Sequence, residues 1–126
     1  MEVNLPDVLA EVTAAFERYE KALVSNDVET LDALFWTSPH VIRYGAGENL
    51  YGHEEILAFR QARPSKGLDR TLTRTVITTF GTTFATANTE FLRDGVDRVG
   101  RQSHSWARLP EGWRIVAAHV SWMDEG

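Results

Sequence analysis

Apolar residues recur at helical spacing early in the chain, whereas the second half alternates apolar and polar positions. A repeat of three or four residues predicts amphipathic helices, and a repeat of two predicts strands with two distinct faces. The first helix is predicted over residues 5–25, with Pro6 in its first turn. Its apolar stripe consists of Val8, Val12, Ala15, Phe16, Tyr19 and Leu23. Tyr19 is therefore expected on the buried side of this helix.

Two shorter helices are predicted after the first. Asp27 is a suitable N-cap for a short second helix, and a third helix is predicted from residue 54 to about 63. In the third helix, Arg60 and Arg63 follow Ile56 by four and seven residues, so both arginines can share the face of Ile56.

The strands complete the expected architecture. They are predicted at residues 40–44, 48–51, 71–80, 83–93, 97–108 and 114–122. Helices followed by a run of strands are typical of an α+β layer fold. We expect a cone-shaped, curved antiparallel sheet with three helices from the N-terminal half covering one face. The mouth of such a cone is expected to form a cavity for a small molecule.

Composition limits the possible functions. The 126 residues predict a single domain over residues 1–126, and the net charge of −5 argues against nucleic acid as a partner. No run of about 18 apolar residues is present, so we expect no membrane association. The chain has no cysteine, which excludes thiol chemistry and favours a cytoplasmic location. Eleven of the 13 basic residues are arginine, the residue best suited to binding carboxylates.

The last two strands carry an unusual number of polar residues among aromatic and β-branched ones. Buried polar side chains cost free energy unless they are partnered, so this pattern indicates a sheet face that lines a polar pocket. His104 and Gln102 share one face of their strand, but the sequence leaves open which face meets the helices. His119 and Ser121 share a face in the last strand, where they either line the cavity floor or belong to an ordinary core.

Arg43 lies between two apolar neighbours in a short strand, and a buried arginine is costly unless it is paired. Either it pairs with an internal acid, for which Glu90 is the expected partner, or it binds an anionic substrate. The strand around Arg43 has no carboxylate, which argues against proton abstraction of the steroid-isomerase type.

The four histidines show no metal-ligand spacing, so no metal is predicted, and no cofactor is predicted either.

Several motifs resemble a known superfamily. The segments at residues 51–56 (YGHEEI) and 112–121 (GWRIVAAHVS) are similar to the nuclear-transport-factor-2-like (NTF2-like, SnoaL-like) cone fold. Those at 41–45 (VIRYG), 59–63 (FRQAR) and 100–106 (GRQSHSW) resemble its AtzH-like subfamily. The resemblance implies a homodimer packed through the outer sheet face and a role beside an amidase in ureido-acid catabolism. It also implies a decarboxylating amidohydrolase that acts on small carboxylated ureas, with one essential tyrosine and one essential arginine.

By this resemblance, Tyr19 and Arg43 are the expected catalytic residues of a cofactor-free enzyme with a small anionic substrate. The family pattern usually has Gln-Thr where this chain has His104-Ser105, which leaves the substrate open. The expected substrate-binding residues are Arg60, Gln102, His119, Trp36, Ser121 and His104. The alternatives are a non-catalytic ligand-binding or dimerisation module and an enzyme of the polyketide-cyclase or ketosteroid-isomerase type.

Overall fold

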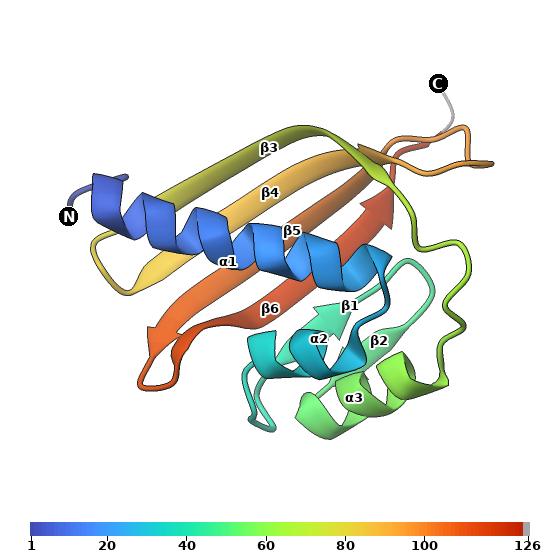
Figure 1. Cartoon of the computed structure of the whole chain (residues 1–126), viewed down its shortest axis with the longest axis horizontal. Helices are drawn as coiled ribbons and strands as arrows, with labels where there is room; N and C mark the ends of the chain where they lie inside the picture. Colours follow the sequence, from blue (N-terminus) through green and yellow to red (C-terminus); the bar gives the residue numbers. More distant parts are fainter. Residues whose placement is uncertain (125–126) are drawn as a thin grey trace.

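The computed structural model describes residues 1–124 and shows one curved sheet with three helices on its concave face (Figure 1). The helices are α1 (Pro6–Val24), α2 (Val28–Leu34) and α3 (His53–Ala62). The strands are β1 (Ile42–Tyr44), β2 (Asn49–Tyr51), β3 (Thr71–Phe80), β4 (Phe84–Leu92), β5 (Gly100–Leu109) and β6 (Gly112–Trp122). The predicted α+β cone is confirmed. Across the described residues, no helix combines the length and the apolarity that crossing a membrane requires.

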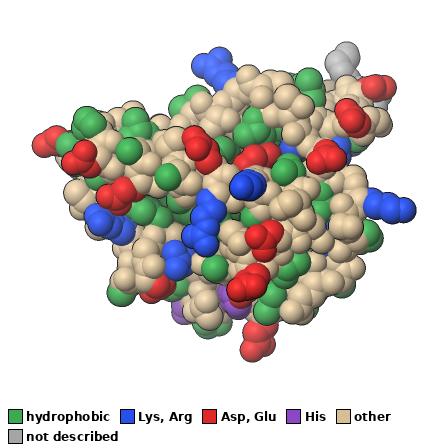
Figure 2. Space-filling model, in the orientation of Figure 1, with side chains coloured by type: hydrophobic (Ala, Val, Ile, Leu, Met, Phe, Trp, Pro, Cys, Tyr) green, Lys and Arg blue, Asp and Glu red, His purple; other side chains and the backbone are tan. Residues whose placement is uncertain are grey.

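The helices form where the apolar spacing predicts them. Proline stands at the start of α1, and Val12, Phe16 and Tyr19 are buried along one side of this helix. Asp27 caps α2, because its side chain accepts a hydrogen bond from the backbone N–H of Thr30 at 3.2 Å. The acidic and basic side chains that remain on the helical face are interspersed (Figure 2).

The six strands lie in the order β2-β1-β6-β5-β4-β3. Strands β3 to β6 are joined as successive hairpins and pair antiparallel, as predicted. β1 pairs parallel with β6, and here the structure differs from the predicted all-antiparallel sheet. A hairpin forces antiparallel pairing. No hairpin joins β1 and β6, because β2, α3 and the strands β3 to β5 lie between them in the chain. Their orientation is therefore not fixed by a turn.

A β-bulge changes the direction of the side chains along β6. Trp106 pairs with Ile115 and Ser105 pairs with Ala117, so Val116 is an extra residue in β6. One inserted residue shifts the alternation by one position. Ile115 and Ala118 are consequently both buried, although they lie three residues apart.

The bulge corrects one prediction. His119 and Ser121 were expected to line the cavity floor, because simple alternation places them on the face of Ile115. Beyond the bulge they face the other way. His119 is exposed opposite Ser103, and Ser121 is half-buried opposite the exposed Arg101. Both residues therefore lie on the outer face of the sheet.

Candidate functional site

Tyr19 and His104 form the centre of the buried polar region. Tyr19 projects from α1, is 2% exposed and packs with its ring 4.5 Å from that of His104, at 90° to it. The ring centre of Phe35, directly after α2, lies 6.3 Å from the ring centre of Tyr19. Gln102, His104 and Trp106 are all buried, so this face of β5 is the one that meets the helices.

Three strands bring Arg43 to the same region. Ala118 in β6 pairs with His104 on one side and with Arg43 on the other. Neighbouring strands lie about 4.8 Å apart, so the backbones of Arg43 and His104 are separated by about 10 Å. The small side chain of Ala118 lies between the two.

Arg43 is paired differently from the prediction. Its Nη1 donates to Glu48 Oε1 at 2.8 Å, and its guanidinium lies 5.2 Å from the centre of the Phe59 ring. Glu90, the expected partner, is exposed on β4. Because its neighbours Thr89 and Phe91 are both buried, the alternation of the strand turns Glu90 to the outer face.

Arg60 is the most unusual residue of the region. It projects from α3, is 1% exposed and lies over the ring of Phe35 at 5.0 Å. None of its three guanidinium nitrogens makes a well-formed hydrogen bond among residues 1–124, but the Tyr19 hydroxyl lies beside the guanidinium and interacts with it. Burial lowers the pKa of Arg60 and Arg43 lowers it further, while the neighbouring Tyr19 hydroxyl and the Asp32 carboxylate offset part of this shift.

Arg63 lies one turn further along, at the end of α3. Its guanidinium is 5.7 Å from the Phe59 ring, and its buried Nε and Nη2 find no partner in the described part of the chain. Burial, followed by the positive charges of Arg60 and Arg43, lowers the pKa of Arg63 to about 10. The two arginines do share one region, as their spacing predicted.

Arg70, just before β3, extends the cluster from the opposite side. Its side chain is 1% exposed. Its Nε and Nη2 donate to the two carboxylate oxygens of Glu20 at 2.9 and 2.6 Å, and Nη2 also donates to Gln102 Oε1 at 3.0 Å. The guanidinium lies 4.4 Å from the ring centre of Phe91.

These positive charges set the protonation of the two central groups. Burial by itself raises the pKa of Tyr19, but Arg60, Arg70 and Arg43 outweigh it and lower that pKa below its usual value. The same three arginines act together with burial on His104 and hold its pKa well below its usual value. At neutral pH the imidazole is therefore neutral, and the tyrosine hydroxyl is a stronger proton donor than a free tyrosine.

The charges do not balance within the described residues. The four arginines are Arg43, Arg60, Arg63 and Arg70, and the ion pairs found involve Glu48 for the first and Glu20 for the last. Arg60 and Arg63 have no ion pair in the same part of the chain. Two buried or half-buried guanidiniums beside a polarised hydroxyl form a site suited to an anion with carboxylate groups.

The structure brings together five of the eight residues predicted from the sequence, namely Tyr19, Arg43, Arg60, Gln102 and His104. His119 and Ser121 lie on the outer face. Trp36 is half-buried beside His40, with ring centres 6.1 Å apart, while its neighbour Phe35 contacts Tyr19. Sequence reasoning missed Arg70 and its partner Glu20. Arg70 lies in a loop without periodicity, so no signal in the sequence distinguishes it.

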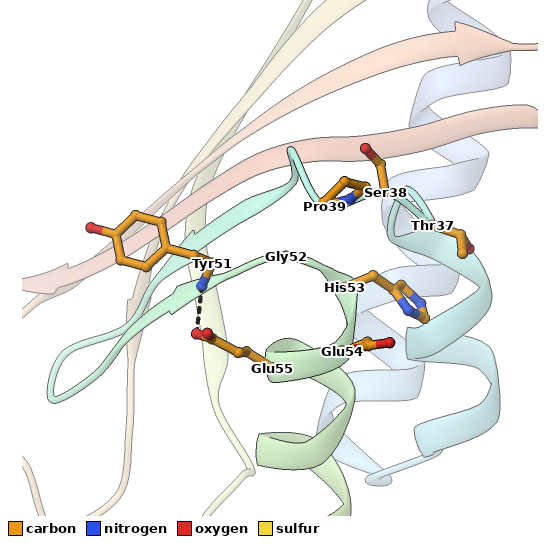
Figure 3. Close-up of a pocket in the computed structure, with 8 residues that line it drawn as sticks. All are labelled: Thr37, Ser38, Pro39, Tyr51, Gly52, His53, Glu54 and Glu55. Carbon is orange, nitrogen blue, oxygen red and sulfur yellow. Dashed lines mark hydrogen bonds between the residues drawn. The ribbon is translucent and has the colours of Figure 1, made fainter.

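A separate pocket of about 570 Å³ opens at the start of α3 (Figure 3), and no arginine of the cluster lines it. It is lined by Thr37, Ser38, Pro39, Tyr51, Gly52, His53, Glu54 and Glu55. The backbone N–H of Tyr51 donates to Glu55 Oε1 at 2.9 Å, and His53 Nε2 lies 2.6 Å from Asp32 Oδ1. None of its residues belongs to the predicted site.

Comparison with known proteins gives a consistent result. The AtzH-like family model matches residues 1–126. A Pectobacterium atrosepticum protein of the DUF3225 family, of unknown function, is 66% identical with a TM-score of 0.95, covering 97% of this chain and 95% of its own. A cystatin-like fold protein from Burkholderia xenovorans is 52% identical with a TM-score of 0.95, covering 100% of this chain and 99% of its own.

A more distant structure, an NTF2-like superfamily protein from Salmonella enterica serovar Typhimurium, is 26% identical with a TM-score of 0.76. That match covers 94% of this chain and 93% of the Salmonella chain. No significant match to a curated protein was found. The match over the whole length and the shared cone architecture agree: the chain belongs to the AtzH-like family of the NTF2-like superfamily.

Proposed function

We propose that this protein is a cofactor-free decarboxylating amidohydrolase that acts on a small carboxylated urea or a similar dicarboxylate, beside an amidase in ureido-acid catabolism. The observation that carries the proposal is Arg60, a fully buried guanidinium that forms no ion pair among the described residues and lies beside the polarised Tyr19. A buried unpaired charge costs several kcal/mol of stability, on the order of 5 kcal/mol, unless a ligand supplies the opposite charge. An anionic substrate would supply it.

The chemistry assigns a role to each group. Arg60 and Arg63 bind the carboxylates, and Arg43 is held in place by Glu48. In decarboxylation of an N-carboxylated urea, the bond between nitrogen and the carboxylate carbon breaks and CO₂ leaves. The electron pair stays on the nitrogen and is shared with the urea carbonyl. The Tyr19 hydroxyl donates a hydrogen bond to the developing charge and supplies the proton that neutralises it.

The surrounding arginines favour this role for Tyr19. They stabilise the tyrosinate that remains after proton transfer, which is the meaning of its lowered pKa. His104 stays neutral, so it packs against the tyrosine ring without adding a further positive charge. Solvent then returns the proton to Tyr19 once the product has left.

An isomerase of the ketosteroid type is less well supported. That reaction needs a carboxylate free to take a proton from the substrate. Glu48 and Glu20 form ion pairs with arginines, Asp32 near Arg60 lies 2.6 Å from His53 Nε2, and Glu90 is on the outer face. A binding module without catalysis agrees with the same arginine cluster, and the experiment must separate it from an enzyme.

The test measures CO₂ release from N-carboxylated ureas by the wild type and by Tyr19→Phe, with Arg18→Gln on the exposed side of α1 as the control. Loss of one donor to a developing negative charge is expected to lower kcat by about 10²–10³. Calorimetric titration with malonate measures anion binding independently of turnover. Malonate binding without turnover of any carboxylated urea would support the binding module. Equal turnover by the wild type and Tyr19→Phe would refute the catalytic role of the tyrosine.

We also propose a homodimer formed through the outer face of the sheet. Val76 is 47% exposed on that face and Phe84 is 39% exposed at the end of the β3–β4 hairpin. Exposed apolar residues on a broad, semi-apolar sheet face favour its burial against a second copy.

A further inference from the structure

Gln102 is buried at the inner face of β5, and only one half of its side-chain amide is satisfied. Its Oε1 accepts a hydrogen bond from Arg70 Nη2 at 3.0 Å. Its Nε2 is also buried but has no hydrogen-bond partner within residues 1–124. The side chain as a whole is 1% exposed, so the free N–H groups are shielded from solvent.

The orientation of the amide is determined by Arg70. A guanidinium only donates hydrogen bonds, so it must face the oxygen of the glutamine and not the NH₂ group. The reverse orientation would place two donors against each other. Arg70 is itself fixed by its two hydrogen bonds to Glu20 and by packing on Phe91. The chain Glu20–Arg70–Gln102 therefore presents the NH₂ group on the side away from Arg70.

Gln102 lies next to the region described above. Gln102 and His104 are two residues apart on the same face of β5, and the His104 ring contacts Tyr19. Arg70 is close enough to Tyr19 and His104 to change the pKa of both. The site thus combines guanidiniums that suit carboxylates with a neutral N–H donor at Gln102 that suits a carbonyl oxygen and whose orientation Arg70 fixes. The His104 ring nitrogens and Trp106 Nε1 are also buried without partners among residues 1–124.

We propose that Gln102 recognises the urea carbonyl of the ligand through Nε2, and that Arg70, held by Glu20, is the positioning residue that orients this donor. The inference rests on the proposed function and deepens it, because it separates carbonyl recognition from carboxylate recognition. Neutral hydrogen bonding at Gln102 selects ligands that carry an amide or urea group. The arginines alone would accept any small dicarboxylate.

The test compares two stable ligands by calorimetric titration. N-carbamoylglycine carries a urea carbonyl and a carboxylate, whereas malonate carries carboxylates only. Gln102→Leu should weaken binding of N-carbamoylglycine by about tenfold or more, the usual effect of one lost hydrogen bond to a buried group. Malonate should bind Gln102→Leu as tightly as it binds the wild type. Arg70 keeps both bonds to Glu20 in this variant, and thermal melts verify that the fold is retained.

The test of the positioning role of Arg70 needs a result that unfolding of the variant alone would not produce. Arg70→Gln should remove the preference for N-carbamoylglycine over malonate in the same way as Gln102→Leu, while Arg18→Gln on the exposed surface of α1 keeps it. In the double variant, the second substitution should add no further loss of that preference, because both act through one donor.

The outcomes separate this inference from the proposed function. If the wild type binds malonate and Gln102→Leu weakens both ligands equally, carbonyl recognition by Gln102 is refuted and the anion site stands. If Arg70→Gln keeps the ligand preference, the positioning role is refuted. If the wild type binds neither ligand, the anion site itself is wrong, and the inference is overturned with it.

Discussion

Replacing Arg60 by methionine tests whether its guanidinium serves ligand binding at the expense of stability. Arg60 is 1% exposed and forms no ion pair among the described residues, so the Tyr19 hydroxyl beside it replaces only part of its lost hydration. Its contact with the Phe35 ring at 5.0 Å offsets part of the lost hydration free energy, because a desolvated cation–π contact contributes about 1–2 kcal/mol. Methionine is unbranched, fits a similar volume and packs well against aromatic rings.

The expected gain in stability follows from the desolvation of Arg60 and its contact with Phe35. Exchanging buried ionic groups for apolar residues of similar volume often stabilises a protein by about 1–4 kcal/mol. After loss of the cation–π contact, Arg60→Met should raise the free energy of unfolding by about 1–2 kcal/mol. For a domain of this size that corresponds to a rise in Tm of about 4–8 °C.

The assay is urea denaturation at pH 7, with and without malonate. Malonate should stabilise the wild type by about 2.7 kcal/mol at 100 times its Kd and should leave Arg60→Met unchanged. Arg43→Met is the matched contrast, because it removes a guanidinium that does have a partner in Glu48 and should not stabilise the fold. An Arg60→Met variant less stable than the wild type would refute the reasoning, since Arg60 would then be structural.

Three other features give measurable expectations. The pKa of His104 is lowered in the fold, so below pH about 6.5 the unfolded chain binds a proton that the folded chain does not. Stability should then fall with decreasing pH by at most about 1.4 kcal/mol per pH unit from this residue, and His104→Gln should remove that slope. Gly100→Ala should destabilise by about 1–3 kcal/mol, because the new Cβ would overlap the Phe91 ring at Cζ. Val76→Glu should convert the proposed dimer to a monomer in light scattering, because it places a charge on the outer face.

Each of these expectations has a contradicting result. An unchanged slope between pH 6.5 and 5 in His104→Gln would mean that other groups carry the acid sensitivity. Equal melting of Gly100→Ala and the wild type would mean that Phe91 moves freely, despite Arg70 and Trp122 on its two sides. A wild type that is monomeric at micromolar concentration would refute the dimer without any variant.

Local sequence patterns predicted the helices and strands well. They failed where the position or pairing of a side chain depends on residues elsewhere in the fold. The stripe containing Tyr19 places that residue correctly, because helical spacing depends only on neighbours in the chain. Alternation also separates Gln102 and His104 from Arg101 and Ser103. It could not say which set is inside, because both sets are polar.

The errors have definite physical causes. Glu90 lies between the buried Thr89 and Phe91, and the alternation of its own strand places it on the outer face, away from Arg43. The partner of Arg43 is Glu48, five residues away across a tight turn, and the pair depends on the geometry of that turn. Arg70 reaches Glu20 across fifty residues of sequence, and no periodicity connects them.

The bulge at Val116 in β6 decides which of two sets of side chains the site receives. With the bulge, the position between Arg43 and His104 is occupied by the methyl group of Ala118. If β6 kept Val116 but paired without the bulge, every later residue would shift by one position against β5, and His119 and Ser121 would turn inward. Deleting Val116 has the opposite outcome, because it removes the extra residue itself: Ala118 stays opposite His104, and the inward face keeps its side chains. The inner face of β6 therefore tolerates loss of this residue but not its incorporation into regular pairing.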